Sequence, residues 1–268
     1  MNEYINHTKA LMKKDILDYI RDPYTVAFMF MPLLLPAILL LVSAGTQSSL
    51  SISMESFEKI NQYTSIAVPM FFIMFTFLSG ASYSSDVLSG EWERGTMEQM
   101  LTTQIGGIAL IVSKVIVILG ITILSMVILL LGTTGAFVLL QKEMPQVDIY
   151  FPLRSILPVG LILAITCACI MVLISISCKT IRESSFRLGL LEILPVLLGI
   201  FNDAASSQFD GVIRMFVPLG NLMYLLKMII ERRATLITYC CVLGSSFIYI
   251  ALIIVITCVA FKKIRSSL

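Results

Sequence analysis

The stretch VSKVIVILGITILSMVILLLGTTGAFVLL, Val112–Leu140, decides the fold. Lys114 is its single charged residue, and the rest is apolar apart from scattered Gly, Ser and Thr. About 20 mostly apolar residues cross the hydrocarbon core of a bilayer as a helix, because a helix satisfies its own backbone hydrogen bonds there. The stretch therefore predicts a membrane-spanning helix.

Five further apolar runs meet the same criterion. Over the whole chain of 268 residues, 57% are hydrophobic and 13% are charged, whereas soluble domains have about 45–50% apolar and about 25% charged residues. We therefore predict an all-α polytopic membrane protein, with a single transmembrane domain over residues 1–268. The six predicted spans are Tyr24–Gly45, Tyr63–Ser85, Val112–Leu140, Ile156–Cys178, Ser184–Asn202 and Thr235–Phe261.

The charged residues predict the orientation of these spans. If the amino terminus is cytoplasmic, most of the 19 basic residues fall in cytoplasmic segments, and the carboxyl-terminal Lys262 and Lys263 return to the same side. The positive-inside rule favours this arrangement, with both termini in the cytoplasm. Nucleic-acid binding is disfavoured, because a net charge of +2 leaves no excess of cations for phosphates.

Residues 1–23 are predicted to form a retained amphipathic helix. On a helical wheel Ile5, Met12, Ile16, Tyr19 and Ile20 share one face, and most charges lie elsewhere. Such a helix suits the cytoplasmic membrane interface. The alternative is an ordinary cytoplasmic helix that packs on the loops of the protein itself.

Missing residue types argue against an enzyme. His7 is the only histidine, so the spans contain neither an H-E-x-x-H zinc site nor a Ser/His dyad. The P-loop pattern G-x-x-x-x-G-K-[ST] is absent as well, so the chain has no P-loop nucleotide site. We predict no catalytic residue, no metal site and no cofactor in this chain. Energy for transport must then come from a partner subunit or from an ion gradient.

The loop at residues 86–104 carries the strongest motif. Thr96-x-x-Gln99 is a capping-box pattern that starts a short helix, and Glu98 in its first turn complements the helix dipole. The helix would present Met97, Met100 and Leu101 as an apolar ridge. Adaptable Met side chains suit docking into a groove of a cytoplasmic partner. The alternative is a loop helix packed on its own bundle.

Two further features concern the transport pathway. Residues 203–233 are interrupted by Pro218 and polar residues such as Asn221 and Lys227, which predicts a re-entrant or amphipathic element on the outer face. Glu192 lies inside the fifth predicted span, where an ionisable residue is costly and marks a possible pathway site. The alternative is a carboxylate near the interface that pairs with Arg187 or Arg182.

Residues 91–103 resemble the E-x-E-R-G-T-x-E-x-L-L-x-T signature of the permease subunits of type-2 ABC exporters. The proline that usually follows is replaced by Gln104. Residues 217–227 are similar to the P-L-x-N-x-x-x-x-x-K segment of the sodium-exporter-like branch, with Pro218, Asn221 and Lys227 at the motif positions. In that family the first motif forms the coupling helix that contacts the ATPase. The residues assigned to coupling are Glu91, Trp92, Glu93, Arg94, Gly95, Thr96, Met97, Glu98, Met100 and Leu101.

The resemblance implies an exporter permease in a bacterial cell membrane that forms half of a translocation pathway. Its partners would be two copies of a cytoplasmic ABC ATPase, which bind ATP and Mg, and a second copy of this permease or a similar one. The implied cargo is an antimicrobial peptide, an antibiotic or sodium ions, although the segment Thr46–Gln62 leaves no room for the large outer domain common in that branch. The alternative is a gradient-driven carrier or channel without an ATPase.

Overall fold

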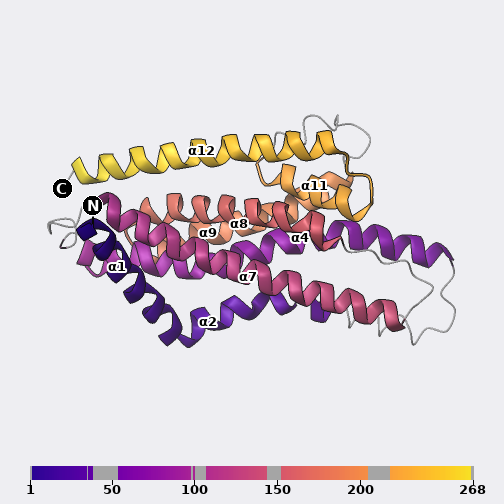
Figure 1. The fold of residues 1–268 in the computed structure, drawn as a ribbon, viewed down its shortest axis with the longest axis horizontal. Coiled ribbons are helices and arrows are strands. Elements are labelled where there is room, and N and C mark those ends of the chain that lie inside the picture. The colour runs from indigo at the N-terminus through magenta and orange to yellow at the C-terminus, as the bar shows by residue number, and fades with distance from the viewer. Residues whose placement is uncertain are drawn as a thin grey trace.

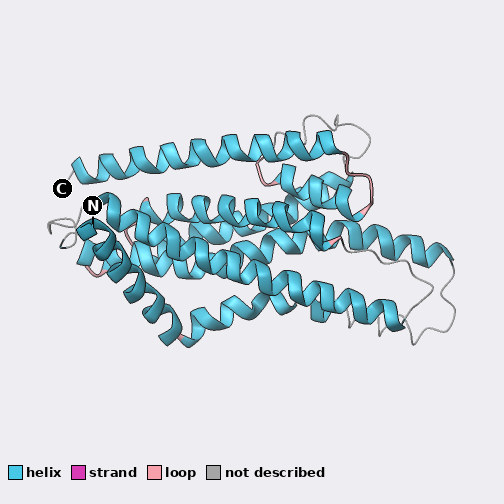
Figure 2. Cartoon of the chain, in the orientation of Figure 1, coloured by secondary structure: helices cyan, strands magenta, loops and turns pink. Residues whose placement is uncertain are grey.

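The computed structural model describes residues 2–34, 36–38, 54–97, 99, 107–143, 152–204 and 218–266. Within these ranges the chain forms helices and short connections, and no strand occurs (Figure 2). The helices are α1 (Asn2–Arg21), α2 (Pro23–Phe30), η1 (Met31–Leu33), α4 (Met54–Ser84), η2 (Ser85–Ser89), α5 (Gly90–Glu93), α7 (Gly107–Glu143), α8 (Leu153–Ile176), α9 (Ile181–Ala204), α11 (Gly220–Ile230) and α12 (Leu236–Ser266).

The long helices form a bundle with α4, α7 and α8 in contact at its centre (Figure 1). α12 packs along α8, and α9 packs against α4. Fully buried Phe72, Phe77, Ile118 and Leu163 fill the space between these helices. At Gly80 the helices lie so close that a Cβ atom would stand 2.5 Å from Thr122 Cγ2, so any larger residue would have to displace its neighbours.

Within the described residues, four helical segments are long and apolar enough to cross a membrane, and they match four of the six predicted spans. The other two predictions remain open. The run at 24–45 continues into residues 39–45, which lie outside the described residues, and α9 over the fifth run is a helix of 24 residues that is not among the four. The four spanning segments are Ala67–Glu93, Ile111–Leu139, Leu153–Ile176 and Leu236–Lys263.

The spanning segment Ala67–Glu93 is longer than the second predicted span, Tyr63–Ser85. The helix begins at Met54, inside the outer segment expected from the sequence, and helical structure continues through η2 and α5 to Glu93. η2 is a π-helix of five residues. π-Helical turns are rare and occur mostly at functional sites. The motif at residues 91–103 therefore begins in the last helical turn of a span.

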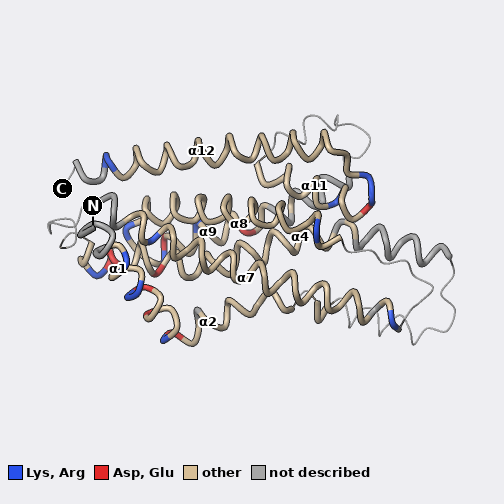
Figure 3. Tube along the Cα trace, viewed as in Figure 1, with Lys and Arg blue, Asp and Glu red and all other residues tan. Residues whose placement is uncertain are grey.

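Charged residues of the described chain lie mainly at the two ends of the bundle, and the middle carries few (Figure 3). One end contains α1 and the carboxyl-terminal end of α12, so both ends of the chain lie on the same side (Figure 1). α11 lies at the opposite end, beside the start of α12. This distribution is expected of a bundle whose middle sits in hydrocarbon.

α1 combines the two predicted alternatives. It packs on α7 through buried Tyr19 and partly buried Met12. Ile16 and Ile20 from the predicted apolar face remain exposed, at 43% and 64%. One side of the helix thus packs against the bundle, and another side exposes apolar residues. Asp22 then ends α1 and caps α2 by accepting a hydrogen bond from Tyr24 N–H.

Candidate functional site

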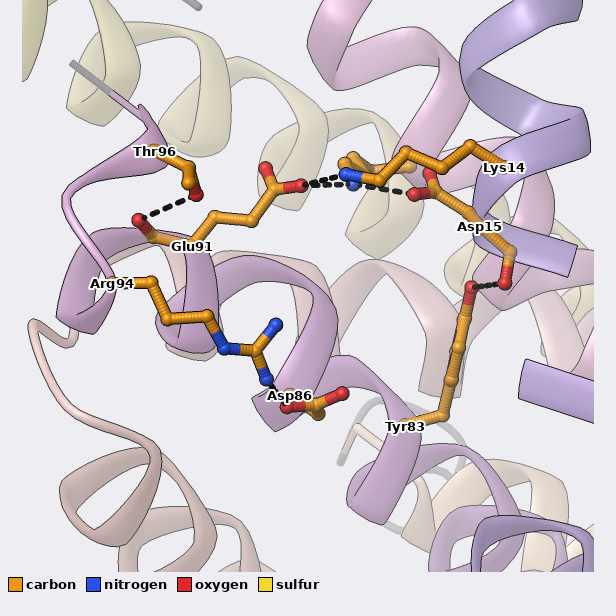
Figure 4. Close-up of polar contacts among 8 residues, drawn as sticks. Lys14, Asp15, Tyr83, Asp86, Glu91, Arg94 and Thr96 are labelled. Carbon is orange, nitrogen blue, oxygen red and sulfur yellow. Dashed lines mark hydrogen bonds and ion pairs between the residues drawn. The ribbon is translucent and has the colours of Figure 1, made fainter. Parts of the chain in front are cut away.

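The site is built around residues Glu91–Leu101, here called the signature segment, of which the structure describes 91–97 and 99. Helix α5 ends at Glu93, and Arg94 and Gly95 form a turn in which Gly95 has a φ of 70°. This left-handed conformation is easily adopted only by glycine, which explains the glycine at this place. The Thr96 hydroxyl donates to the backbone carbonyl of Glu91 and closes the turn (Figure 4).

A buried charge cluster holds Glu91. The ammonium of Lys114 on α7 donates to Glu91 Oε1 and to Asp15 Oδ1 on α1, both at 2.8 Å. Lys14 Nζ lies 3.6 Å from the same Glu91 oxygen. Lys114, Asp15 and Glu91 are only 1%, 3% and 4% exposed. One buried cation thus joins two acids from two other helices, and we call Lys14, Asp15, Glu91 and Lys114 the charge cluster (Figure 4).

The charge cluster is incompletely paired. Asp15 Oδ2 and Glu91 Oε2 are buried and accept no hydrogen bond in the described part of the chain. Burial raises the pKa of Asp15 above its ordinary value of 3.8, and attraction to Lys114 opposes that rise. Two carboxylates facing one fully buried ammonium therefore form a costly arrangement, which is not what packing alone would select.

Two tyrosines support Asp15. The Tyr83 hydroxyl on α4 donates to the backbone carbonyl of Asp15 at 3.1 Å. The rings of Tyr19 and Tyr83 meet edge to face, with centroids 5.0 Å apart. Burial raises the pKa of Tyr19 to about 12, so this phenol stays protonated at neutral pH. α1 is therefore attached to the bundle both by charge and by aromatic packing.

The rest of the signature segment divides into inward and outward residues. Glu93 is exposed but accepts a hydrogen bond at 2.8 Å from the backbone N–H of Ile181, at the start of α9. Arg94 is exposed and pairs with Asp86 at 2.6 Å. Trp92 Nε1 is buried and has no hydrogen-bond partner within the described residues.

Of the predicted apolar ridge, the structure describes only Met97. Its side chain is fully buried, so it packs within this chain and is not free to dock on a partner. Glu91 likewise faces inward. Met100 and Leu101 lie outside the described residues, as does Glu98. Among the described residues of the segment, the exposed ones are Glu93, Arg94, Gly95 and Gln99.

A cavity of about 440 Å³ opens between α1 and the signature segment. Its wall includes the charge cluster, the Asp86 and Arg94 pair, and the acids Asp18 and Asp22. The cavity therefore has a charged lining and lies directly beside the exposed turn at Arg94.

A hydroxyl network fastens η2 to the neighbouring helices. Ser175 Oγ on α8 lies 2.8 Å from Ser84 Oγ and accepts a hydrogen bond from Ser184 on α9. The Ser89 hydroxyl donates to the Ser175 carbonyl at 2.8 Å. The π-helical turn that precedes the signature segment in the chain is thus held by hydroxyl groups, which rotate easily.

The outer motif has a structural role in this chain. Asn221 is buried and donates from Nδ2 to the hydroxyls of Ser245 and Ser246 on α12, both at 3.0 Å. Pro218 lies in an exposed turn, and Lys227 pairs with Glu231 at 3.9 Å. The Asn221 amide thus ties α11 to α12.

Glu192 is half-buried on α9. Of the two arginines offered as its partners, Arg187 pairs with Glu183 at 2.6 Å instead. No group of three or more potential metal ligands occurs in the described part of the chain.

Sequence reasoning missed Lys114, Asp15 and Tyr83 as site residues. In the sequence, Lys114 stands out only as the single charge in the longest apolar run. A charge in such a run is a functional hypothesis by itself and was the available signal. Nothing in the sequence indicates which acids it meets, because Asp15 lies 99 residues away.

The model of the family described as "ABC-2 family transporter protein" matches residues 9–264. The match covers nearly the whole chain and includes the larger part of α1, the signature segment and nearly all of α12. No curated protein matches the chain in a direct sequence comparison.

Proposed function

Since this chain belongs to the ABC-2 family of transporter proteins, we propose that it is the permease subunit of an exporter and that the signature segment couples it to a separate ATPase. Permeases of this family generally work with an ABC ATPase partner. The proposal places both termini and the signature segment in the cytoplasm of a bacterial cell. Two ATPase copies, which bind ATP and Mg, would serve two permease copies or this permease and a similar one.

The observation that carries the proposal is the exposed turn at Glu93, Arg94 and Gly95. It stands at the end of a spanning segment, on the side of the bundle where α1 lies, and it borders a charged cavity. A polar, protruding turn of this kind suits contact with a soluble partner, because charges at an interface rim select the partner and its orientation. Inside the chain, Glu91 and Met97 anchor the turn to the bundle.

The test is purification of the tagged chain from its native membranes. We expect a stoichiometric ABC ATPase to co-elute, identified by mass spectrometry, and the eluate to hydrolyse ATP. Arg94→Glu should reduce co-elution at least several-fold, because it reverses the exposed charge. Arg187→Glu is the matched control, since Arg187 is also an exposed arginine in an ion pair and lies on α9. Equal co-elution with both variants would contradict the role of the turn.

The alternative is a gradient-driven carrier without an ATPase. It predicts that no ATPase co-elutes and that transport in reconstituted vesicles responds to an ion gradient and not to ATP. Substitution of Glu192 would then abolish transport, because it is a half-buried acid within the bundle. In the favoured model Glu192→Gln leaves ATPase co-elution unchanged.

For the cargo we propose an antimicrobial peptide, an antibiotic or sodium ions, on the strength of the motif resemblance. Deletion of the gene should sensitise cells to one of these classes, and plasmid-borne Arg94→Glu should fail to restore resistance. Unchanged tolerance to all three classes would reject this assignment of the cargo.

A further inference from the structure

We propose that Lys114 is a positioning residue that joins α1 to the signature segment, so that the two move as one body and carry the motion of the ATPase into α2. The inference rests on the proposed function, and it gives a role to a residue and to a helix outside the signature. Its basis is the geometry of the charge cluster.

The first step is that a single ammonium group contacts both acids. Lys114 Nζ donates at 2.8 Å to Asp15 on α1 and at 2.8 Å to Glu91 in α5. All three side chains are at least nine-tenths buried. Moving either acid away from Lys114 would separate opposite charges at a site where all three side chains are almost fully buried, which is strongly unfavourable. The two elements are therefore held at one relative position.

The second step is that net stability does not account for this arrangement. The desolvation of buried ions offsets much of their attraction, and apolar residues of similar volume often replace a buried ion pair without loss of stability. The unpaired oxygens of Asp15 and Glu91 add to the cost. What the cluster provides is a defined position of α1 relative to the signature segment.

The third step is that the connection to α4 is adjustable. Between α4 and the signature segment lies the π-helix η2, held by hydroxyl groups of Ser84 and Ser89 on Ser175. Hydroxyl groups rotate and can donate to or accept from other partners, so these contacts can be exchanged as the helices shift. A displacement of the signature segment can thus be absorbed at η2, whereas it cannot be absorbed at Lys114.

The fourth step leads from α1 to α2. Asp22 alone separates the two helices, and its N–H contacts the carbonyls of Asp18 and Tyr19 at 3.3 Å. The Asp22 carboxylate caps α2 through Tyr24 N–H at 3.1 Å. A displacement of α1 therefore displaces the start of α2, which packs on α4 and α7.

Spin-label distances test the connection. With the exposed Cys240, Cys241 and Cys258 replaced by serine, labels are placed at Lys13→Cys on α1 and Gln99→Cys in the signature segment. A second pair joins Lys13→Cys to Lys262→Cys on α12. All three label sites are exposed in the structure. Distances are measured in nanodiscs for the chain alone and for its complex with the ATPase, with and without a non-hydrolysable ATP analogue.

In the native cluster we expect one narrow distance between positions 13 and 99, unchanged by nucleotide, while the distance between 13 and 262 shifts. The decisive variant carries Asp15→Leu, Glu91→Met and Lys114→Met together, because an all-apolar cluster is expected to fold. In that variant the distance between 13 and 99 should broaden in the chain alone and shift with nucleotide. Lys114→Arg alone should retain the native distances. Lys9 is an exposed lysine of α1, and Lys9→Met should leave both distances unchanged.

The outcomes separate the two proposals. Native-like distances in the all-apolar variant, or no nucleotide-dependent shift between 13 and 262 in the native complex, would overturn the role of Lys114. Failure of any ATPase to bind the native chain would instead overturn the proposed function. In that case the broadening between 13 and 99 in the chain alone still decides whether Lys114 joins the two elements.

Discussion

Lys114 Nζ and Asp15 Oδ1 lie 2.8 Å apart although 99 residues separate them in the chain. Lys114 belongs to a spanning helix and Asp15 to a helix that precedes the first apolar run. Because Glu91 shares the same ammonium, the contact brings the amino-terminal helix and the family signature to one place. The permease thus has a charged junction at the end of an otherwise apolar bundle.

Lys114→Met should destabilise the protein strongly. It leaves Asp15 and Glu91 buried with only the half-exposed Lys14 nearby, and breaking a buried ion pair typically costs about 3–5 kcal/mol. Replacing all three charges by apolar residues should cost much less, because no charge then remains to be compensated. Reversible thermal unfolding in detergent measures both. A triple variant as unstable as Lys114→Met would show that the cluster stabilises the fold in its own right.

Asp15 should make stability depend on pH in acid. Because burial raises its pKa in the folded protein above 3.8, the folded state holds this proton more tightly than the unfolded state. The contribution of Asp15 to the free energy of unfolding is therefore fully present below pH 3.8. It is lost as the pH rises through the raised pKa of the folded state. The unfolding free energy of the native protein minus that of Asp15→Asn should increase as the pH falls through this window. A difference independent of pH would contradict the raised pKa.

Gly80→Ala should destabilise the bundle by about 1–3 kcal/mol, the usual cost of overpacking. The added methyl would meet Thr122 Cγ2 at 2.5 Å and Met171 Sδ at 2.7 Å. Gly120→Ala is the matched control, because nothing lies within 4 Å of its Cβ position and alanine favours a helix by up to about 1 kcal/mol. The midpoint of thermal unfolding should fall for Gly80→Ala and rise for Gly120→Ala. A loss of stability in both would point to a general intolerance of alanine.

Asn221→Ala should loosen α11 from α12. The amide donates to Ser245 and Ser246, and a typical intramolecular hydrogen bond contributes about 0.5–1.5 kcal/mol to stability. Both serines also donate to the Val242 carbonyl, so their hydroxyls stay satisfied without Asn221. In a cycle with Ser245→Ala and Ser246→Ala, the losses should be less than additive. Strict additivity in unfolding measurements would exclude the contact.

Met97→Ala should lower stability by about 2–5 kcal/mol, because the side chain is fully buried and its removal leaves a cavity. Co-elution of the ATPase should fall only in proportion to the loss of folded protein. Gln99→Ala, at an exposed position of the same segment, should leave stability within about 0.5 kcal/mol. If Met97→Ala reduced co-elution of fully folded protein, Met97 would have to reach the partner.

Periodicity and composition predicted much of the fold, because hydrocarbon imposes a simple constraint. A run of apolar residues such as Val112–Leu140 has few alternatives to a spanning helix. The prediction was less accurate at the ends of α4, where helical structure extends from Met54 through η2 to Glu93. Helix ends depend on local capping and on neighbours such as Ser175, which hydropathy does not register.

The motif predicted where the site lies in the chain but not which way its residues face. Glu91 and Met97 lie in the same segment as Glu93 and Arg94, yet the first two are buried and the other two exposed. The difference follows from the turn at Gly95 and from α1 and α7, which cover one side of the segment. A spacing pattern cannot contain this information, because the covering residues come from distant parts of the chain.

Local physical rules read from the sequence alone therefore establish a helical membrane protein, the absence of a P-loop from the chain and the position of the signature segment. These properties depend on residues close together in sequence and on the solvent that surrounds them. The tertiary structure decided that one lysine of a spanning helix meets an acid of α1 and an acid of the signature segment. Contacts between elements far apart in the chain arise from packing, and their electrostatic consequences appear only when the burial of each charge is known.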